Sequence, residues 1–204
     1  MTTALLLAAA YVCGSIPTGV LLSGLRGVDP RDIGSGNIGA TNVARTAGAT
    51  LGALTLLGDT AKSLLPVAIA FRAGLGEEVA ALAGLAAFAG HLFPCFLRFQ
   101  GGKGVATALG ALLGLAPVGM ALVVPLFATV VLVSRYVSLA SMTMAAATPP
   151  ILYALGYHAA VVGVALAMGV LILVRHRDNM RRIRFGTEWR LGGGRTNARD
   201  SGVA

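Results

Sequence analysis

Residues 34–45 hold the first group of side chains in this sequence that could bind a ligand. Three glycines in this segment lack a Cβ atom, which lets the backbone turn sharply and come close to a ligand. No carboxylate lies in residues 33–58 to repel an anion, and Arg45 supplies a forked cation suited to phosphate or carboxylate. Glycine and asparagine also form ordinary turns, so this segment alone is equally typical of a loop. Its short hydrogen-bonding residues are Ser35, Asn37, Thr41 and Asn42.

A second group, residues 99–107, places glycines around one lysine just before an apolar stretch. Backbone N–H groups of a glycine-rich turn at a helix N-terminus, together with a lysine, are typical of a phosphate site. This is not a Walker A loop, because Gly104 stands where Ser or Thr should follow the lysine and Leu97 stands where the first glycine belongs. That argues against a nucleoside triphosphatase. The alternative is an interfacial turn with a snorkelling lysine. We favour a phosphate site formed by Gly101, Gly102, Lys103 and Gly104.

A third group, residues 175–188, mixes basic and polar residues. If the segment is helical, His176 and Asn179 lie on one face because they are three residues apart. Arginines alone are typical of a lipid-headgroup anchor, but an anchor does not explain His176, Asn179 or Glu188. We expect Glu188 to be structural and to pair with basic neighbours. The arginines that fit an anchor are Arg181, Arg182 and Arg184.

Two serines and one charged pair lie within or beside apolar segments. Ser138 and Ser141 are three residues apart and share a helical face, although serines in membrane helices are usually packing residues. Asp59 and Lys62 have the same spacing, and charges inside a membrane span are functional candidates by default. Because these two can neutralise each other, we predict a structural pair that also supports Arg45.

The composition is that of a membrane protein. Of the 204 residues, 56% are hydrophobic and 12% are charged, and the mean hydropathy is +0.79. A soluble domain is about a quarter charged. We therefore predict an all-α integral membrane protein built as one helical bundle. Cys13 and Cys95 lack CxxC spacing and indicate neither a disulfide nor a metal site.

Apolar runs set the expected number of spans. The run at 104–134 is too long for one helix crossing a ~30 Å core, and we expect a turn near Pro117 to divide it. The run at 137–174 divides near residues 156–158, and a kink is expected at 14–17. This predicts about seven transmembrane helices, some short; a five-span arrangement is the alternative. The apolar runs are residues 4–25, 51–71, 77–97, 104–134 and 137–174.

The basic residues predict the orientation. With seven spans, all 16 lysines and arginines except Arg72 and Lys62 fall on one side of the membrane. Positive charge marks the cytoplasmic side. We therefore expect the N-terminus outside, the C-terminus in the cytoplasm, and every polar cluster facing the cytoplasm.

Taken together, residues 34–45, 101–107 and 175–188 resemble the three signatures of the PlsY family, the bacterial acyl-phosphate:glycerol-3-phosphate acyltransferases. Residues 90–94 and 138–141 also fit, and the resemblance covers about residues 11–188. One departure is Ser63, where the family pattern has glycine; we expect it to affect helix packing and not the reaction.

The resemblance implies transfer of a fatty acyl group from acyl phosphate to the 1-hydroxyl of glycerol 3-phosphate. The products are lysophosphatidate and inorganic phosphate, in the first step of phospholipid synthesis. It implies a multi-pass protein of the bacterial inner membrane whose active site faces the cytoplasm. The expected partners are acyl phosphate, glycerol 3-phosphate and membrane lipids, with no cofactor, metal or nucleic acid. Residues 1–189 would form a single catalytic domain and residues 190–204 a disordered cytoplasmic tail.

The resemblance also assigns roles to residues. His176 could accept the hydroxyl proton or donate a hydrogen bond, and a substrate phosphate could be the base instead. Expected structural residues are Asp59, Lys62 and Glu188. The expected catalytic residues are Ser35, Arg45, Lys103, His176 and Asn179. Those expected to bind substrate or phosphate are Asn37, Thr41, Asn42, Gly101, Gly102, Gly104 and Ser141.

Two other classes fit less well. Glycerolipid acyltransferases that use soluble donors carry a His-x4-Asp pattern, which none of His91, His158 and His176 begins. We expect His91 to make a structural hydrogen bond. A transporter of phosphate or organophosphate would place polar groups at the bilayer midplane in broken helices. Only Asp59, Lys62 and the kink at 14–17 could serve there, whereas the polar clusters gather at one interface.

Overall fold

The structure, a computed structural model, describes residues 2–192, and within that range every regular element is helical. This confirms the predicted all-α fold. The elements are α1 (Thr3–Ser15), α2 (Thr18–Gly24), α3 (Ala40–Ala47), α4 (Ala49–Arg72), α5 (Gly76–Leu92), the 3₁₀ turn η1 (Cys95–Leu97), α6 (Val105–Leu115), α7 (Pro117–Ser134), α8 (Val137–Ala154), α9 (Ala159–Arg175) and α10 (Arg177–Arg184).

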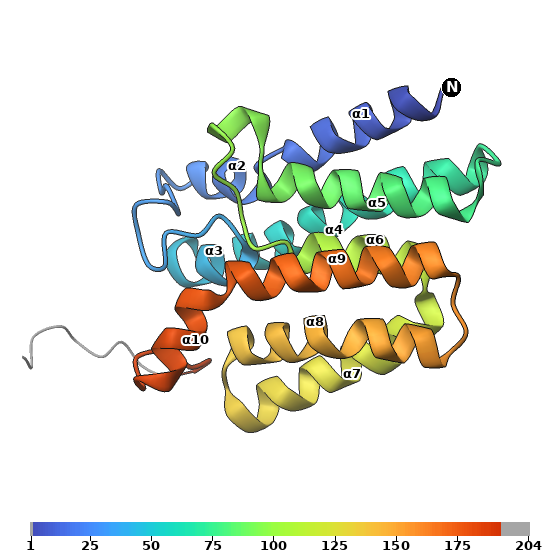
Figure 1. The fold of residues 1–204 in the computed structure, drawn as a ribbon. Helices are drawn as coiled ribbons and strands as arrows, with labels where there is room; N and C mark the ends of the chain where they lie inside the picture. Colours follow the sequence, from blue (N-terminus) through green and yellow to red (C-terminus); the bar gives the residue numbers. More distant parts are fainter. Residues whose placement is uncertain (1, 193–204) are drawn as a thin grey trace, which may run out of the picture.

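The long helices run side by side as a bundle (Figure 1). Helix α5 packs against α1, α4, α6 and α9, while α7 and α8 form a hairpin that joins the bundle through α9. The short helices α3 and α10 lie together at one end of the bundle, which we call the site end. The largest fully buried side chains belong to this core: Phe88, Leu92, Met120, Leu152, Met168 and Ile172.

The helices are interrupted near the proline and glycine residues at which breaks were expected from the sequence. Helix α1 ends before Pro17 and α2 starts after it, and α7 begins at Pro117. Between α8 and α9, the His158 side chain accepts a hydrogen bond from the Ala160 N–H (3.2 Å) and caps α9. Helices α1 and α5 approach so closely that a Cβ atom on Gly14 would overlap the Ala87 backbone. Small residues of this kind let membrane helices pack at short range.

Five helical segments in the described range are long and apolar enough to cross a membrane, and a sixth results if α9 and α10, bent by 52°, count as one span. Of the helices expected from the apolar runs, α6 has only 11 residues, and α9, with 17, reaches the required length only together with α10. At 1.5 Å per residue α6 covers roughly half of a ~30 Å core. The difference from the expected seven therefore lies in α6 and in the bent end of α9.

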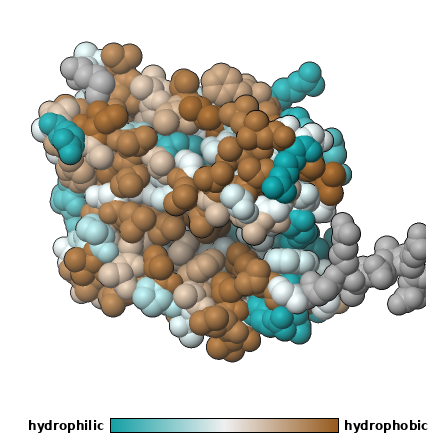
Figure 2. Space-filling view, turned by 180° about the vertical axis from the view of Figure 1, so that it is seen from behind, coloured by the Kyte–Doolittle hydropathy of each residue, from teal (hydrophilic) through white to brown (hydrophobic). Residues whose placement is uncertain are grey.

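Large apolar side chains cover the outer surface, with Leu132 80% exposed and Val133 82% exposed on α7. In water such a surface would drive aggregation, whereas in a bilayer it faces lipid. Figure 2 shows this face largely brown, with teal residues gathered most densely at the site end. The molecule is an integral membrane protein, as its composition predicted.

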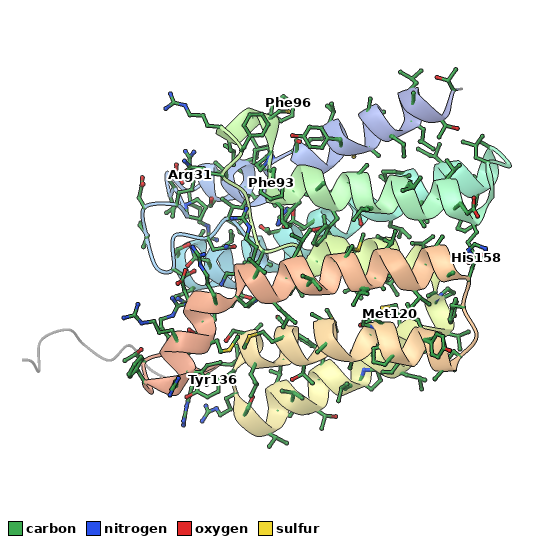
Figure 3. The ribbon with its side chains drawn as sticks, viewed as in Figure 1. Arg31, Phe93, Phe96, Met120, Tyr136 and His158 are labelled. Carbon is green, nitrogen blue, oxygen red and sulfur yellow. The ribbon has the colours of Figure 1, made fainter. Side chains whose placement is uncertain are left out.

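The segment after α10 folds back onto the turn between α7 and α8. The Leu191 N–H donates to the Arg135 carbonyl (2.8 Å), and Arg190 Nε donates to the Tyr136 hydroxyl (2.8 Å). Figure 3 shows Tyr136 at the site end. Arg190 and Leu191 thus make contacts with this turn, and the disordered tail expected over 190–204 stays a prediction. Residues 193–204 lie outside the described range, and the single catalytic domain over 1–189 stays a prediction.

Candidate active site

The loop before α3 is shaped by one buried side chain, Asn42. Its Nδ2 donates to the carbonyls of Pro30 (2.8 Å), Ile33 (3.1 Å) and Asn37 (2.9 Å), and its Oδ1 accepts from the Ser35 N–H (2.9 Å). These bonds use both amide N–H groups and the carbonyl oxygen. Asn42 was predicted to bind substrate, but in this structure its side chain holds the loop that presents Ser35.

The other polar residues of this loop divide into two kinds. Asn37 Oδ1 accepts from the Gly39 N–H (2.8 Å), a local turn that leads into α3. Ser35 and Thr41, by contrast, are exposed at the surface of the loop. Of the four short polar residues, these two are the ones free to meet a substrate.

Close packing against α5 requires glycine at the positions before α6. The N–H groups of Gly101 and Gly102 donate to the carbonyls of Leu92 (3.2 Å) and His91 (3.1 Å), so they close the end of α5. A Cβ atom on Gly102 would overlap the His91 ring, and Gly104 has φ +83° with Phe88 filling the space beside it. Phosphate contact was predicted for these glycines; the first two amides are already bonded in this structure.

Lys103 connects this loop to α10. Its Nζ donates to Asn179 Oδ1, although the two residues are 76 positions apart in the sequence. Asn179 is buried, and its Nδ2 donates onward to Glu188 Oε1 (2.6 Å). The structure thus joins the second and third sequence groups in one chain of hydrogen bonds: Lys103, Asn179, Glu188.

Glu188 is the centre of this polar cluster. Its Oε1 also accepts from the Ser138 hydroxyl (2.7 Å), and its Oε2 accepts from Arg182 Nε (2.6 Å). Glu188 therefore pairs with a basic neighbour, as expected, and its structural role stays a prediction. From the sequence, Ser138 was expected to be a packing residue and Arg182 part of a lipid-headgroup anchor, so neither was among the predicted site residues. Their signals were the three-residue spacings between Ser138 and Ser141 and between Asn179 and Arg182.

Arg45 enters from α3. Its guanidinium lies 4.5 Å from the centre of the Trp189 ring, within the range of a cation–π contact. Glu188 and Arg182 both act electrostatically on Arg45. The first sequence group therefore meets the other two, and Trp189 is a further residue that sequence reasoning missed.

The charges of this cluster shift two pKa values. The pKa of Lys103 is lowered to about 8, mainly by burial and also by Arg182 and Arg45, while Glu188 and Asp178 oppose the shift. Burial alone would raise the Glu188 pKa, but hydrogen bonds from Asn179, Ser138 and Arg182 outweigh it and hold the pKa below its ordinary value. Near pH 7 the cluster has a charged Lys103 and an ionised Glu188.

His176 sits at the junction of α9 and α10 and is 3% exposed. Its Nδ1 lies 2.8 Å from the Ile172 carbonyl, which can only accept, so Nδ1 carries a proton. In the neutral ring Nε2 is then left with a lone pair. The electrostatic field at the ring comes from Lys103, Glu188 and Arg182.

Three predicted residues, Ser141, Asp59 and Lys62, make contacts within the bundle. The Ser141 hydroxyl donates to the Val137 carbonyl of its own helix (2.8 Å), while Ser138 is the serine that reaches Glu188. The predicted pair of Asp59 and Lys62 is confirmed as an ion pair (2.9 Å), and both residues are buried.

The surroundings of this pair differ from those expected. Lys62 also meets His91 Nδ1 (2.9 Å), which confirms a structural bond for His91. Its second neighbour is the Ile16 carbonyl (3.0 Å). Among the described contacts of the pair, none involves Arg45, so the expected support of Arg45 is not direct. Ser63 donates to the Thr107 carbonyl and thereby joins α4 to α6, a packing contact as expected.

Within residues 2–192, no group of three or more His, Cys, Asp or Glu side chains is arranged to hold a metal ion. The donors at the site end are cations, amides and hydroxyls, which suit an anionic organic ligand.

The chain matches known proteins over nearly its whole length. Residues 4–186 match the family model described as glycerol-3-phosphate acyltransferase. A glycerol-3-phosphate acyltransferase of Geobacter sulfurreducens is 50% identical over 184 residues, which cover 90% of this chain and 95% of the relative.

Two solved structures share the fold. One is PlsY, an integral membrane glycerol 3-phosphate acyltransferase, in its glycerol 3-phosphate form, with a TM-score of 0.89 and 40% identity over 93% of this chain and 96% of that one. The other is PlsY in its lysophosphatidic acid form, with a TM-score of 0.86 and 40% identity over 92% and 94% of the two chains. The chain therefore belongs to the PlsY family of integral membrane glycerol-3-phosphate acyltransferases, as its three motifs predicted.

Proposed function

We propose that this enzyme transfers a fatty acyl group from acyl phosphate to the 1-hydroxyl of glycerol 3-phosphate and releases lysophosphatidate and inorganic phosphate. The observation that carries the proposal is the hydrogen bond from Lys103 to Asn179, which in turn donates to Glu188, so that two motifs meet near Arg45. The forms of the solved PlsY structures, with glycerol 3-phosphate and with lysophosphatidic acid, support the same acceptor and product.

The charge of the cluster suits phosphate. Lys103, Arg45 and Arg182 face two carboxylates, those of Glu188 and Asp178, so positive charge is in excess. The first N–H groups of α6, directly after Lys103, have no partner within their helix, and Gly104 supplies no side-chain cap. Such a helix end favours an anion. Both proposed substrates carry phosphate and would bring the missing negative charge.

The transfer itself needs little from the protein beyond placement. The acceptor hydroxyl oxygen attacks the acyl carbonyl carbon, a new C–O bond forms, and the C–O bond to phosphate breaks with its electron pair leaving on phosphate. Phosphate is a stable leaving group. Holding the two substrates in line, and neutralising the charge that develops, supplies most of the rate enhancement. We assign that neutralisation to Lys103 and Arg45.

The hydroxyl proton has two possible acceptors. His176 Nε2 has a lone pair, because Nδ1 donates to Ile172, and a substrate phosphate oxygen is the alternative. The exposed Ser35 hydroxyl would contact a substrate phosphate, with Asn42 holding its loop. Ser141 and Asn179 would act from the buried side, Asn179 by directing Lys103.

We place the site at the cytoplasmic face of the bacterial inner membrane, with the N-terminus outside. The positive-inside rule supports this orientation, because the basic residues gather at the site end. Glycerol 3-phosphate would then arrive from the cytoplasm, and the acyl phosphate from the bilayer.

The identity of the acyl donor gives the most direct test of the proposed reaction. Purified protein in detergent is incubated with glycerol 3-phosphate and either palmitoyl phosphate or palmitoyl-CoA, and phosphate and lysophosphatidate are measured. We expect both products to form in equal amounts with palmitoyl phosphate and neither with palmitoyl-CoA. Turnover with palmitoyl-CoA alone would overturn the proposed donor. Uptake of glycerol 3-phosphate into proteoliposomes without turnover would point to a transporter instead.

A further inference from the structure

A second polar cluster lies inside the bundle, beneath the loop that carries Lys103. It consists of Asp59 and Lys62 on α4 and His91 on α5, all at most 5% exposed. Lys62 Nζ lies 2.9 Å from Asp59 Oδ1, 2.9 Å from His91 Nδ1 and 3.0 Å from the Ile16 carbonyl. An ammonium group has three N–H donors, and three acceptors surround this one. The Lys62 ammonium is therefore surrounded by acceptors from the protein itself.

The protonation of His91 follows from this geometry. Its Nδ1 faces an ammonium, which can only donate, so Nδ1 accepts and the ring proton sits on Nε2. The Nε2 edge of the ring is the part that packs on Gly102, where an added Cβ atom would overlap it. Lys62 thus fixes both the tautomer and the orientation of the His91 ring, and this ring packs directly against Gly102.

Backbone hydrogen bonds from the end of α5 also fix the loop at Gly101 and Gly102. The carbonyls of His91 and Leu92 accept from the N–H groups of Gly102 and Gly101, and Leu92 also accepts from Arg175 at the end of α9. Near this corner, Figure 3 shows Phe93, whose ring lies 5.2 Å from the Arg175 guanidinium. The residue that follows these contacts in the chain is Lys103.

We infer that His91, fixed by Lys62 and Asp59, is a positioning residue that sets the place of Lys103 through Gly102. This inference rests on the proposed function, because it assigns a purpose to the position of Lys103. It extends the site by a second layer whose members touch no substrate. It also gives the buried ion pair a role beyond helix packing.

Two substitutions of His91 separate its two contacts. In His91→Asn, the side-chain amide oxygen stands near the place of Nδ1, so an acceptor for Lys62 remains while the ring edge under Gly102 is lost. In His91→Gln, the amide reaches the place of Nε2 and refills part of that space. Thr148→Ala is the matched control, because Thr148 is buried and its hydroxyl donates to the Met144 carbonyl of its own helix, away from both lysines.

The first readout needs no substrate. Lys62 and Lys103 are the only lysines in the sequence, and Lys62 is buried. The rate at which acetic anhydride modifies Lys103, followed by mass spectrometry across a pH series, therefore gives the pKa of its amine. The charged groups that face this amine are Arg182, Glu188 and Asp178, together with Arg45 from α3.

We expect the midpoint of that titration near pH 8 in the wild type and in Thr148→Ala. In His91→Asn it moves up towards the ordinary lysine value, because a loosened Lys103 becomes hydrated, and in His91→Gln it moves less. The second readout is kcat/KM for acyl transfer, which we expect to fall about tenfold in His91→Asn at unchanged thermal stability.

An unchanged midpoint and an unchanged kcat/KM in folded His91→Asn would overturn the positioning role. A wild type without acyl transfer would instead count against the proposed function, while the acetylation series would still test the positioning of Lys103. Loss of stability with an unchanged Lys103 midpoint would show that His91 serves packing alone, and would also overturn the inference.

Discussion

The two lysines of this chain occupy polar clusters that balance charge in opposite ways. Lys62 is surrounded by Asp59, His91 and the Ile16 carbonyl, all within 3.0 Å. Lys103 donates to a neutral amide, Asn179, and two arginines act on it along with Glu188 and Asp178. Acceptors from the protein surround the Lys62 ammonium, whereas positive charge is in excess around Lys103.

We infer from that difference that Lys62 is a structural lysine and Lys103 a functional one. Both are charged residues in a mostly apolar chain, and burial is costly for either. For Lys62, in what we call the inner cluster, acceptors from the protein offset that cost. Around Lys103, in what we call the outer cluster, the excess positive charge would be neutralised by a bound anion, as expected of a phosphate site.

The inner cluster should show the largest effect on folding. Lys62→Met leaves the buried Asp59 carboxylate without its cation, and we expect it to lower the free energy of unfolding by about 3–5 kcal/mol. The double variant Asp59→Asn/Lys62→Met removes both charges and should recover most of that loss. Unfolding by SDS in mixed micelles measures both. Equal losses in the single and double variants would show that the ion pair is not what stabilises this region.

The outer cluster should show its effect on rate. Lys103→Met removes the charge that faces the developing phosphate, and we expect kcat/KM to fall by about 10²–10³ with stability nearly unchanged. Lys103→Arg keeps the charge and should retain part of the activity. Phosphate release under steady-state conditions gives the comparison. Activity close to wild type in Lys103→Met would remove Lys103 from the mechanism.

Glu188 tests whether the outer cluster depends on its geometry. Glu188→Gln weakens the hold on Asn179 and Arg182, and we expect kcat/KM to fall by about 10²-fold through misplacement of Lys103. Glu78→Gln is the control, since Glu78 is exposed and its partner His158 lies at the opposite end of the molecule (Figure 3). Equal activities in the two variants would count against an organising role for Glu188.

The smallest expected effect is on pH dependence. The pKa of Lys103 is lowered to about 8, so the ammonium is present below that pH and is lost as the pH rises through it. We therefore expect kcat/KM to decline above pH ~8, by about tenfold per unit. Lys103→Arg should move this limb to higher pH, because a guanidinium stays charged. A limb that is unmoved in Lys103→Arg belongs to another group.

Much of this arrangement could be predicted from the sequence, because it rests on local patterns. Apolar runs interrupted at Pro17 and Pro117 gave the helices and their breaks. The pairing of Asp59 with Lys62 followed from helical spacing. The three motifs identified the family and the basic residues of the site.

The remainder depends on contacts between distant segments. Ser138 and Ser141 share a helical face, and only the position of Glu188 shows which one joins the cluster. In the sequence Arg182 cannot be told apart from its neighbouring arginines, and only its hydrogen bond to Glu188 in the structure distinguishes it. Asn42 was predicted at the substrate, yet three carbonyls of its own loop hold its amide, and loop paths of this kind have no periodic signal.

The central claim is that the site end holds a phosphate between Lys103 and Arg45, and Trp189 can report this directly. It is the only tryptophan in the sequence, and its ring lies against the Arg45 guanidinium. Purified wild type and Lys103→Met are titrated with glycerol 3-phosphate, and with glycerol as control, while Trp189 fluorescence is recorded. We predict a saturable change with glycerol 3-phosphate, no change with glycerol, and a much weaker affinity in Lys103→Met. Identical titrations of the two proteins, or the same response to glycerol, would contradict the claim.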